Sequence, residues 1–155
     1  MKKLPLVSIT ITTKNEEKNI KPCLESIKKQ TYPQNKIEII VVDNNSRDKT
    51  KQIAKQYTKK VFNIGPERSV QRNFGMLQKS SGKYLMFLDA DMRLASKVIS
   101  QAVKKLEDSP LVALYIPEII LGNSFFSRVR RFERSFYTGT VIDCVRIIRK
   151  DIFIT

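Results

Sequence analysis

Short apolar runs alternate with segments of helical periodicity over the first 116 residues, and this alternation limits the fold more than any other feature of the chain. The apolar runs are rich in β-branched residues, which is typical of buried strands. They lie at residues 6–12, 37–42, 60–64, 83–88 and 111–116. Between them, apolar residues recur at helical spacing and mark one face of a helix. The pattern predicts an α/β fold with mostly parallel strands and helices on both faces of the sheet.

The chain has the size and composition of one folded domain, which we expect to span residues 1–155. It is 41% apolar, and no apolar run reaches the length of about 18 residues that would cross a membrane. The N-terminal run is interrupted by Ser and Thr, so it is predicted to be a strand and not a signal peptide. Cys23 and Cys144 form neither a disulfide framework nor a metal-ligand spacing, which favours a reducing, cytoplasmic location.

The charge of the chain is strongly positive, with 29 basic and 15 acidic residues and a net charge of +14. This balance suits a polyanionic partner such as nucleic acid, an anionic membrane or a phosphorylated small molecule. The alternative is that scattered Lys residues only solubilise the surface. His is absent, which removes the commonest general base, so catalysis would use carboxylates, Lys, Tyr or a hard metal ion.

Dense polar sequence follows each of the first four predicted strands. These stretches are Thr12–Glu17, Asp43–Asp48, Gly65–Asn73 and Asp89–Met92. Each one alone is typical of a turn or a helix cap. In a parallel sheet, however, the strand ends meet at one edge, where ligands bind. The four stretches together therefore predict a binding site.

Asp89 and Asp91 close the predicted strand "KYLMFL" in the stretch "DAD". In an extended segment, residues two apart point to the same side, so both carboxylates can address one object. Two close carboxylates repel each other unless a cation lies between them, and hard oxygen ligands suit Mg²⁺ or Mn²⁺. The alternative is that Asp91 or Ser96 only caps the helix predicted to begin near Lys97.

Four motifs together resemble the nucleotide-sugar-binding half of family 2 glycosyltransferases. In order, they are "VSITITTKNEEKNI", "EIIVVDNNSRDKT", "RSVQRNFG" and "SGKYLMFLDADM". The resemblance covers roughly residues 4–100. It implies a Rossmann-like GT-A sheet and transfer of a sugar from a nucleotide-diphosphate sugar, with UDP or GDP as the nucleotide. The expected mechanism is inverting and assisted by Mn²⁺ or Mg²⁺.

The resemblance also implies roles for individual residues. Thr12, Lys14 and Glu16 match the loop that lines the base and the ribose of the donor. Asp43 matches the acidic residue that hydrogen-bonds the nucleobase.

The remaining implied roles concern the diphosphate. Arg72 matches a basic residue near the base and the diphosphate, and Arg68 is a second candidate for neutralising this charge. Asp89 matches the acidic residue near the ribose and a second metal ligand. Asp91 matches the principal metal ligand and is the catalytic residue we expect.

The chain departs from the family pattern after the predicted donor-binding core, residues 1–116. Residues 117–155 are expected to begin the acceptor-side region and to leave it incomplete, as in a truncated chain that only binds donor. No Gly-rich turn or acidic pair appears there. An inverting transfer needs a general base, for which Glu118, Glu133 and Asp143 remain as candidates. The acceptor, a glycan or a lipid-linked molecule, is not defined by the sequence.

Residues 124–137 combine aromatic and basic residues at helical spacing. Four apolar residues share one predicted face, and arginines occupy much of the rest: Phe125, Val129, Phe132, Phe136, Arg128, Arg130, Arg131 and Arg134. Such a helix can lie on an anionic membrane, bind a phosphorylated acceptor or cover the sheet. A strand is predicted after it, at residues 140–148.

A basic nucleic-acid-binding protein is the alternative function. The net charge and the aromatic residues interleaved with Arg would suit base stacking. The sequence contains no nucleic-acid-binding motif, and the acidic strand ends would repel phosphate without a metal, so no nucleic-acid partner is expected. A nucleotidyltransferase is disfavoured because the loop after the first strand has no Gly.

Overall fold

One mixed sheet of six strands organises the chain, in the order β3-β2-β1-β4-β6-β5. The structure is a computed structural model and describes residues 3–122, 124–136 and 145–153. The strands are β1 (Val7–Thr13), β2 (Ile37–Asp43), β3 (Val61–Asn63), β4 (Tyr84–Asp89), β5 (Ala113–Tyr115) and β6 (Val145–Arg149). The helices are α1 (Ile20–Lys28), α2 (Thr50–Ala54), α3 (Arg68–Asn73), α4 (Val98–Glu107), α5 (Phe125–Ser135) and α6 (Lys150–Phe153).

The first four strands are parallel, as predicted. β1 is central and pairs with both β2 and β4, and β3 adds to the outer side of β2. β6 then pairs antiparallel with β4, and β5 pairs antiparallel with β6. The predicted α/β sheet of mostly parallel strands is therefore confirmed, with an antiparallel edge that the strand–helix alternation does not specify.

The two faces of β1 pack against different helices because its sequence alternates. Val7, Ile9 and Ile11 are fully buried and belong to the main core with α1 and α4. The opposite face carries small polar residues and lies under α3 and the π-helical segment Phe74–Lys79 that continues it. There, a Cβ on Gly75 would lie 2.3 Å from Cγ2 of Thr10, so only Gly permits this close approach.

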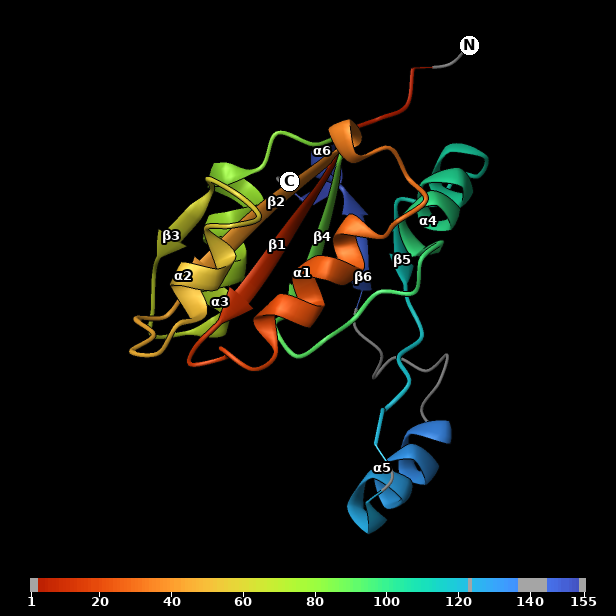
Figure 1. The fold of residues 1–155 in the computed structure, drawn as a ribbon. Coiled ribbons are helices and arrows are strands. Elements are labelled where there is room, and N and C mark those ends of the chain that lie inside the picture. Colours follow the sequence, from red (N-terminus) through yellow and green to blue (C-terminus); the bar gives the residue numbers. More distant parts are fainter. Residues whose placement is uncertain (1–2, 123, 137–144, 154–155) are drawn as a thin grey trace.

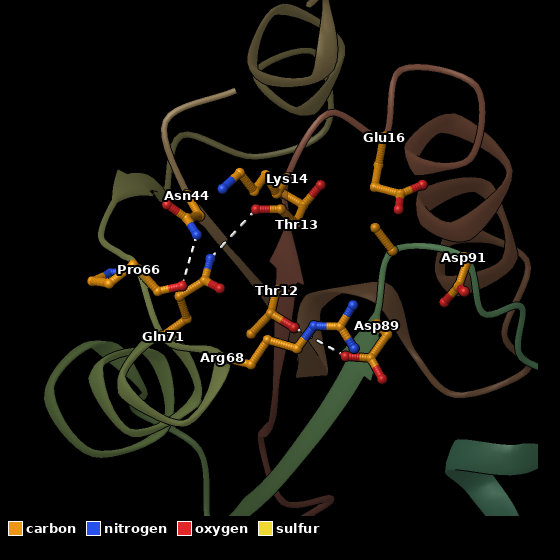
Figure 2. Close-up of a pocket in the computed structure, with 11 residues that line it drawn as sticks. Thr12, Thr13, Lys14, Glu16, Asn44, Pro66, Arg68, Gln71, Asp89 and Asp91 are labelled. Carbon is orange, nitrogen blue, oxygen red and sulfur yellow. Dashed lines mark hydrogen bonds between the residues drawn. The ribbon is translucent and has the colours of Figure 1, made fainter. Parts of the chain in front are cut away.

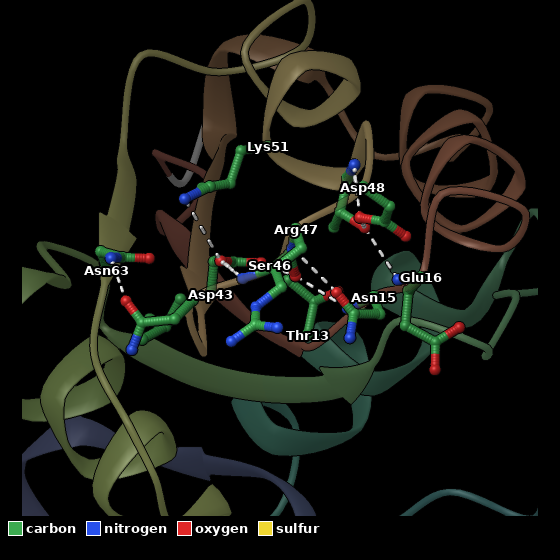
Figure 3. Close-up of polar contacts among 12 residues, drawn as sticks. Thr13, Asn15, Glu16, Asp43, Ser46, Arg47, Asp48, Lys51 and Asn63 are labelled. Atoms are coloured by element: carbon green, nitrogen blue, oxygen red, sulfur yellow. Dashed lines mark hydrogen bonds and ion pairs between the residues drawn. The ribbon is translucent and has the colours of Figure 1, made fainter.

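Two loops after the parallel strands are tied to each other (Figure 3). The backbone N–H of Asn15 donates to Ser46 Oγ at 2.7 Å, and Asn15 Oδ1 accepts from the backbone N–H of Arg47 at 2.9 Å. The backbone N–H of Glu16 donates to Thr50 Oγ1 at 2.8 Å. These bonds hold the loop after β1 against the loop after β2, so both contribute to one rigid edge.

Helix α5 stands apart from the sheet, unlike the other helices (Figure 1). Its aromatic residues are largely exposed, at 73% for Phe125, 78% for Phe126 and 68% for Phe132. The possibility that this segment covers the sheet is therefore wrong for the described chain. Among the described residues, no helix is both long enough and apolar enough to cross a membrane.

Candidate functional site

A pocket of about 300 Å³ opens at the carboxyl ends of β1 and β4 (Figure 2). The residues that line it come from all four polar strand ends: Thr12, Thr13, Lys14, Glu16, Asn44, Pro66, Arg68, Gln71, Asp89, Ala90 and Asp91. A parallel sheet gathers these ends because successive strands run in one direction. The convergence predicted from the sequence is therefore present in the fold.

Six of the predicted site residues line this pocket: Thr12, Lys14, Glu16, Arg68, Asp89 and Asp91. Thr12 and Asp89 are cross-strand partners in the register of β1 with β4. The Thr12 hydroxyl donates to Asp89 Oδ1 at 3.1 Å. Glu16 lies in the loop between β1 and α1, where its Oε2 accepts from Asn19 Nδ2 at 2.7 Å.

Asp43 lies beneath the site and does not line the pocket. Its side chain is fully buried, with Oδ2 accepting from the Ser46 backbone N–H at 2.7 Å and Oδ1 from Ser46 Oγ at 2.5 Å. Lys51 Nζ lies 4.0 Å from Oδ2 (Figure 3). In this arrangement Asp43 fixes the loop after β2, and its contact with a nucleobase stays a prediction.

Arg72 also lies behind the pocket wall and contacts it through Asp89. Its Nη2 donates to Asp89 Oδ1 at 3.0 Å and to Oδ2 at 3.3 Å. The Arg72 guanidinium stacks over the ring of Phe87, with its Cζ 4.3 Å from the ring centroid. One nitrogen of Arg72 thus contacts both carboxylate oxygens while the guanidinium stacks on the ring, an arrangement that favours Arg over Lys and restrains the orientation of Asp89.

Arg68 is the arginine that lines the pocket directly, together with the cation Lys14 (Figure 2). It begins α3 and is exposed, and within the described ranges it makes no ion pair. Arg72, one helical turn later, is occupied by Asp89. Of the two arginines considered for a diphosphate, Arg68 is therefore the one whose guanidinium is available.

Asp91 is the carboxylate best suited to a metal ion. It is exposed at the pocket mouth, and the described part of the chain offers it no hydrogen bond or ion pair. Asp89 already contacts Arg72 and Thr12. The described residues contain no group of three or more His, Cys, Asp or Glu side chains that could hold a metal. An ion at Asp91 would thus need oxygens from a ligand or water, as Mg²⁺ sites in nucleotide enzymes do.

Two buried polar residues of the pocket were missed by the sequence analysis. Gln71 is 2% exposed, and its Nε2 donates to the carbonyls of Val42 at 2.7 Å and Thr13 at 3.4 Å. Asn44 Nδ2 donates to the carbonyl of Pro66 at 2.7 Å. The available signal for Gln71 was its position four residues before Gly75, on the side of the helix that packs against the sheet.

Solved structures with this fold include glycosyltransferases. TarS of S. aureus aligns with a TM-score of 0.72 at 22% identity, over 96% of this chain and 29% of that chain. The mannosyltransferase PcManGT from Pyrobaculum calidifontis, solved in complex with GDP-Man and Mn²⁺, aligns with a TM-score of 0.68 at 25% identity, over 76% of this chain and 36% of that chain. The fold is thus the Rossmann-like GT-A fold that the sequence resemblance implied.

The chain belongs to the family described as Glycosyl transferase family 2, whose profile matches residues 8–153. Glycosyltransferase AglE of Haloferax volcanii is 44% identical over 95 residues, or 57% of this chain and 31% of AglE. Beta-monoglucosyldiacylglycerol synthase of Nostoc sp. is 31% identical over 146 residues, or 85% of this chain and 30% of the relative. The chain spans less than half the length of these curated relatives.

Proposed function

We propose that this chain forms the donor side of a glycosyltransferase and binds a nucleotide-diphosphate sugar with UDP or GDP as the nucleotide. The observation that carries the proposal is the pocket itself, where Asp89, Asp91 and Arg68 meet at the carboxyl ends of parallel strands. A diphosphate is anionic and needs positive charge around it, which Arg68 and a divalent ion can supply. A structural relative with GDP-Man and Mn²⁺ bound supports the same chemistry.

In this proposal, different residues of the pocket bind different parts of the donor. Thr12, Lys14 and Glu16, on the loop after β1, would line the base and the ribose. Asp89 would accept hydrogen bonds from the ribose hydroxyls, since Arg72 restrains the orientation of its carboxylate.

Asp91 would hold the divalent ion, Mn²⁺ or Mg²⁺, with Asp89 as the second carboxylate close by. Such an ion neutralises charge on the departing diphosphate. Arg68 would bind the diphosphate oxygens from the opposite wall. These contacts favour a state in which the nucleotide leaves as an anion, which is what an inverting transfer requires.

The general base of the transfer is not assigned to a residue. Glu118 is bound by Arg146, whose Nε donates to Glu118 Oε1 at 2.6 Å. Glu133 lies on α5, away from the pocket, and Asp143 lies outside the described residues. We therefore propose donor binding as the function of residues 1–116 and place the start of an acceptor-side region at 117–155.

Helix α5 supports a peripheral contact with an anionic membrane as part of this proposal. Phe125, Phe126 and Phe132 are exposed, and Arg128 and Arg130 are exposed beside them. An amphipathic helix with an aromatic face and a basic face binds at the surface of an anionic bilayer. This contact would suit an acceptor carried on a lipid.

Calorimetric titration of UDP, GDP and ADP in the presence of Mn²⁺ tests the proposed donor site. The proposal predicts saturable binding of UDP or GDP and much weaker binding of ADP. A parallel titration with a single-stranded oligonucleotide tests the alternative function. Tight binding of the oligonucleotide that weakens steeply with salt, with no binding of any nucleoside diphosphate, would overturn the proposal in favour of a nucleic-acid-binding protein.

A further inference from the structure

Arg146 is a buried arginine that connects the pocket to the segment after the edge strand β5. It lies on β6 and is only 7% exposed. Its guanidinium stacks over Phe87, with Cζ 4.9 Å from the ring centroid, while Arg72 stacks on the same ring at 4.3 Å. One aromatic ring of β4 thus carries two guanidinium groups, one from α3 and one from β6.

Arg146 lies between two carboxylates. Its Nε donates to Glu118 Oε1 at 2.6 Å, and its Nη2 pairs with the same oxygen. Its Nη1 lies 4.0 Å from Oδ2 of Asp89, the oxygen that Arg72 approaches from the other side at 3.3 Å. The order Arg72, Asp89, Arg146, Glu118 alternates in charge and runs from α3 to the segment after β5.

In this chain of ions Arg146 is buried, and Arg72, Asp89 and Glu118 are half-buried. Burying a charged group such as Arg146 is costly, and apolar side chains of similar volume are often no less stable. Moreover, Arg146 Nη1 and Arg72 Nε are buried without a hydrogen-bond partner among the described residues. Both unpartnered N–H groups belong to arginines that pair with Asp89. The unfavourable free energy of these buried N–H groups therefore arises at the two arginines that orient Asp89.

We propose that Arg146 is a positioning residue for donor binding, which it serves by fixing the Asp89 carboxylate from the side opposite Arg72. The inference rests on the proposed function, because Asp89 is the group that would contact the donor. Through Glu118, Arg146 also ties the donor pocket to the segment that leads into the acceptor-side region. Without Arg146, Glu118 would lose this guanidinium partner, and Asp89 would keep Arg72 as its one described ion-pair partner, so its orientation would be fixed less firmly.

The test measures nucleotide affinity by calorimetry in Mn²⁺, with UDP or GDP, whichever the wild-type chain binds. Arg146→Met keeps an apolar stem on Phe87 and removes the charge. It is expected to weaken binding about tenfold, as loss of an outer partner of a ligand-binding carboxylate does. Arg146→Lys keeps the charge but lacks the planar guanidinium that stacks on Phe87, and it is expected to recover only part of this loss. Arg149→Gln is the matched control on the same strand, since Arg149 pairs with Asp151 away from the pocket.

A double-mutant cycle with Asp89→Asn separates positioning from a merely structural role. If Arg146 acts through Asp89, Arg146→Met adds little to the loss already caused by Asp89→Asn. Independent, multiplying losses would overturn the inference, as would wild-type affinity in Arg146→Met. If circular dichroism shows that Arg146→Met does not fold, Arg146→Lys decides: wild-type affinity overturns the inference, and weakened affinity supports it. Absence of nucleotide binding by the wild-type chain would instead overturn the proposed function and the inference with it.

Discussion

Cys23 packs directly under the pocket, on the inner face of α1. It is fully buried, and its Sγ lies 3.9 Å from the backbone carbonyl of Asp89. Burial raises the pKa of the Cys23 thiol to about 12, and the negative charges of Asp91 and Asp89 add to the shift. The thiolate is the form that reacts, so in the folded chain Cys23 is a packing residue and not a nucleophile.

This state of Cys23 predicts resistance to alkylation. In the native chain at about pH 8, iodoacetamide should leave Cys23 unmodified. The pKa of Cys23 lies far above the ordinary thiol value near 8.5, and burial keeps the reagent away from the sulfur. In urea, the same residue should react readily. Mass spectrometry of the peptide that contains Cys23 measures this independently of Cys144. Rapid modification of the native chain would contradict the burial described for α1.

At the residue scale, the site could be predicted where polar side chains directly follow strands. Thr12, Lys14, Asp89 and Asp91 were found in this way, because the direction of a parallel strand fixes the edge to which they belong. Arg146 could not be found, since its partners lie about 30 and 60 positions away in the sequence and are brought to it only when β6 pairs with β4 and β5.

Asp43 illustrates a different limit at the same scale. The sequence placed it correctly at the end of β2, at the edge of the sheet that carries the pocket. The direction in which its side chain points depends on Ser46, which takes both carboxylate oxygens. A nearby hydroxyl and a ligand can compete for the same carboxylate, and the spacing of residues in the sequence does not predict which of them binds it.

At the element scale, Glu38 joins three segments at the start of the sheet. It lies on β2, and its carboxylate accepts hydrogen bonds from Ser8 of β1, from Lys60 Nζ at 2.5 Å and from the Ser81 backbone N–H at 2.8 Å. Burial raises the pKa of Glu38, but the hydrogen bonds from Lys60, Ser8 and Ser81 and the charge of Lys60 together lower it below its ordinary value. The ionised carboxylate is thus favoured by folding.

The lowered pKa of Glu38 predicts a contribution to stability that depends on pH. The contribution is fully present above the unfolded pKa, near 4.3, and is lost as the pH falls through the lower folded pKa. Urea unfolding at a series of pH values from about 6 to about 3 should therefore show a smaller acid loss for Glu38→Gln than for wild type. Asp108→Asn, at an exposed position after α4, is the control. Equal acid losses in wild type and Glu38→Gln would contradict the role of this junction.

The antiparallel edge of the sheet was the element that the sequence specified least. The run at residues 111–116 was expected as a strand, and β5 forms there but covers only Ala113–Tyr115. It is separated from β4 by β6, which follows much later in the chain. Local pattern identifies strands, whereas the order of strands in a sheet depends on long-range pairing that the alternation of strand and helix does not encode.

At the scale of the whole molecule, α5 gives the chain a second exposed surface away from the pocket (Figure 1). Flotation with vesicles that contain anionic lipid should recover the wild-type chain, and neutral vesicles or raised salt should recover less, because arginines contribute to the binding. Replacing Phe126 and Phe132 with Ser should reduce recovery several-fold, since the apolar face is lost. Leu77→Ser, an exposed apolar position in the π-helical segment, should have no effect. Equal recovery for all three chains would remove the membrane contact from the proposal.

Asp91 is the residue that we propose makes nucleotide binding depend on a divalent ion. The decisive measurement is calorimetric titration of UDP and GDP, with and without Mn²⁺, into wild type, Asp91→Asn and the control Asp108→Asn. We expect Mn²⁺ to strengthen binding at least tenfold in wild type and in Asp108→Asn, and to have little effect in Asp91→Asn. Binding by Asp91→Asn that Mn²⁺ strengthens as much as in wild type would contradict the account.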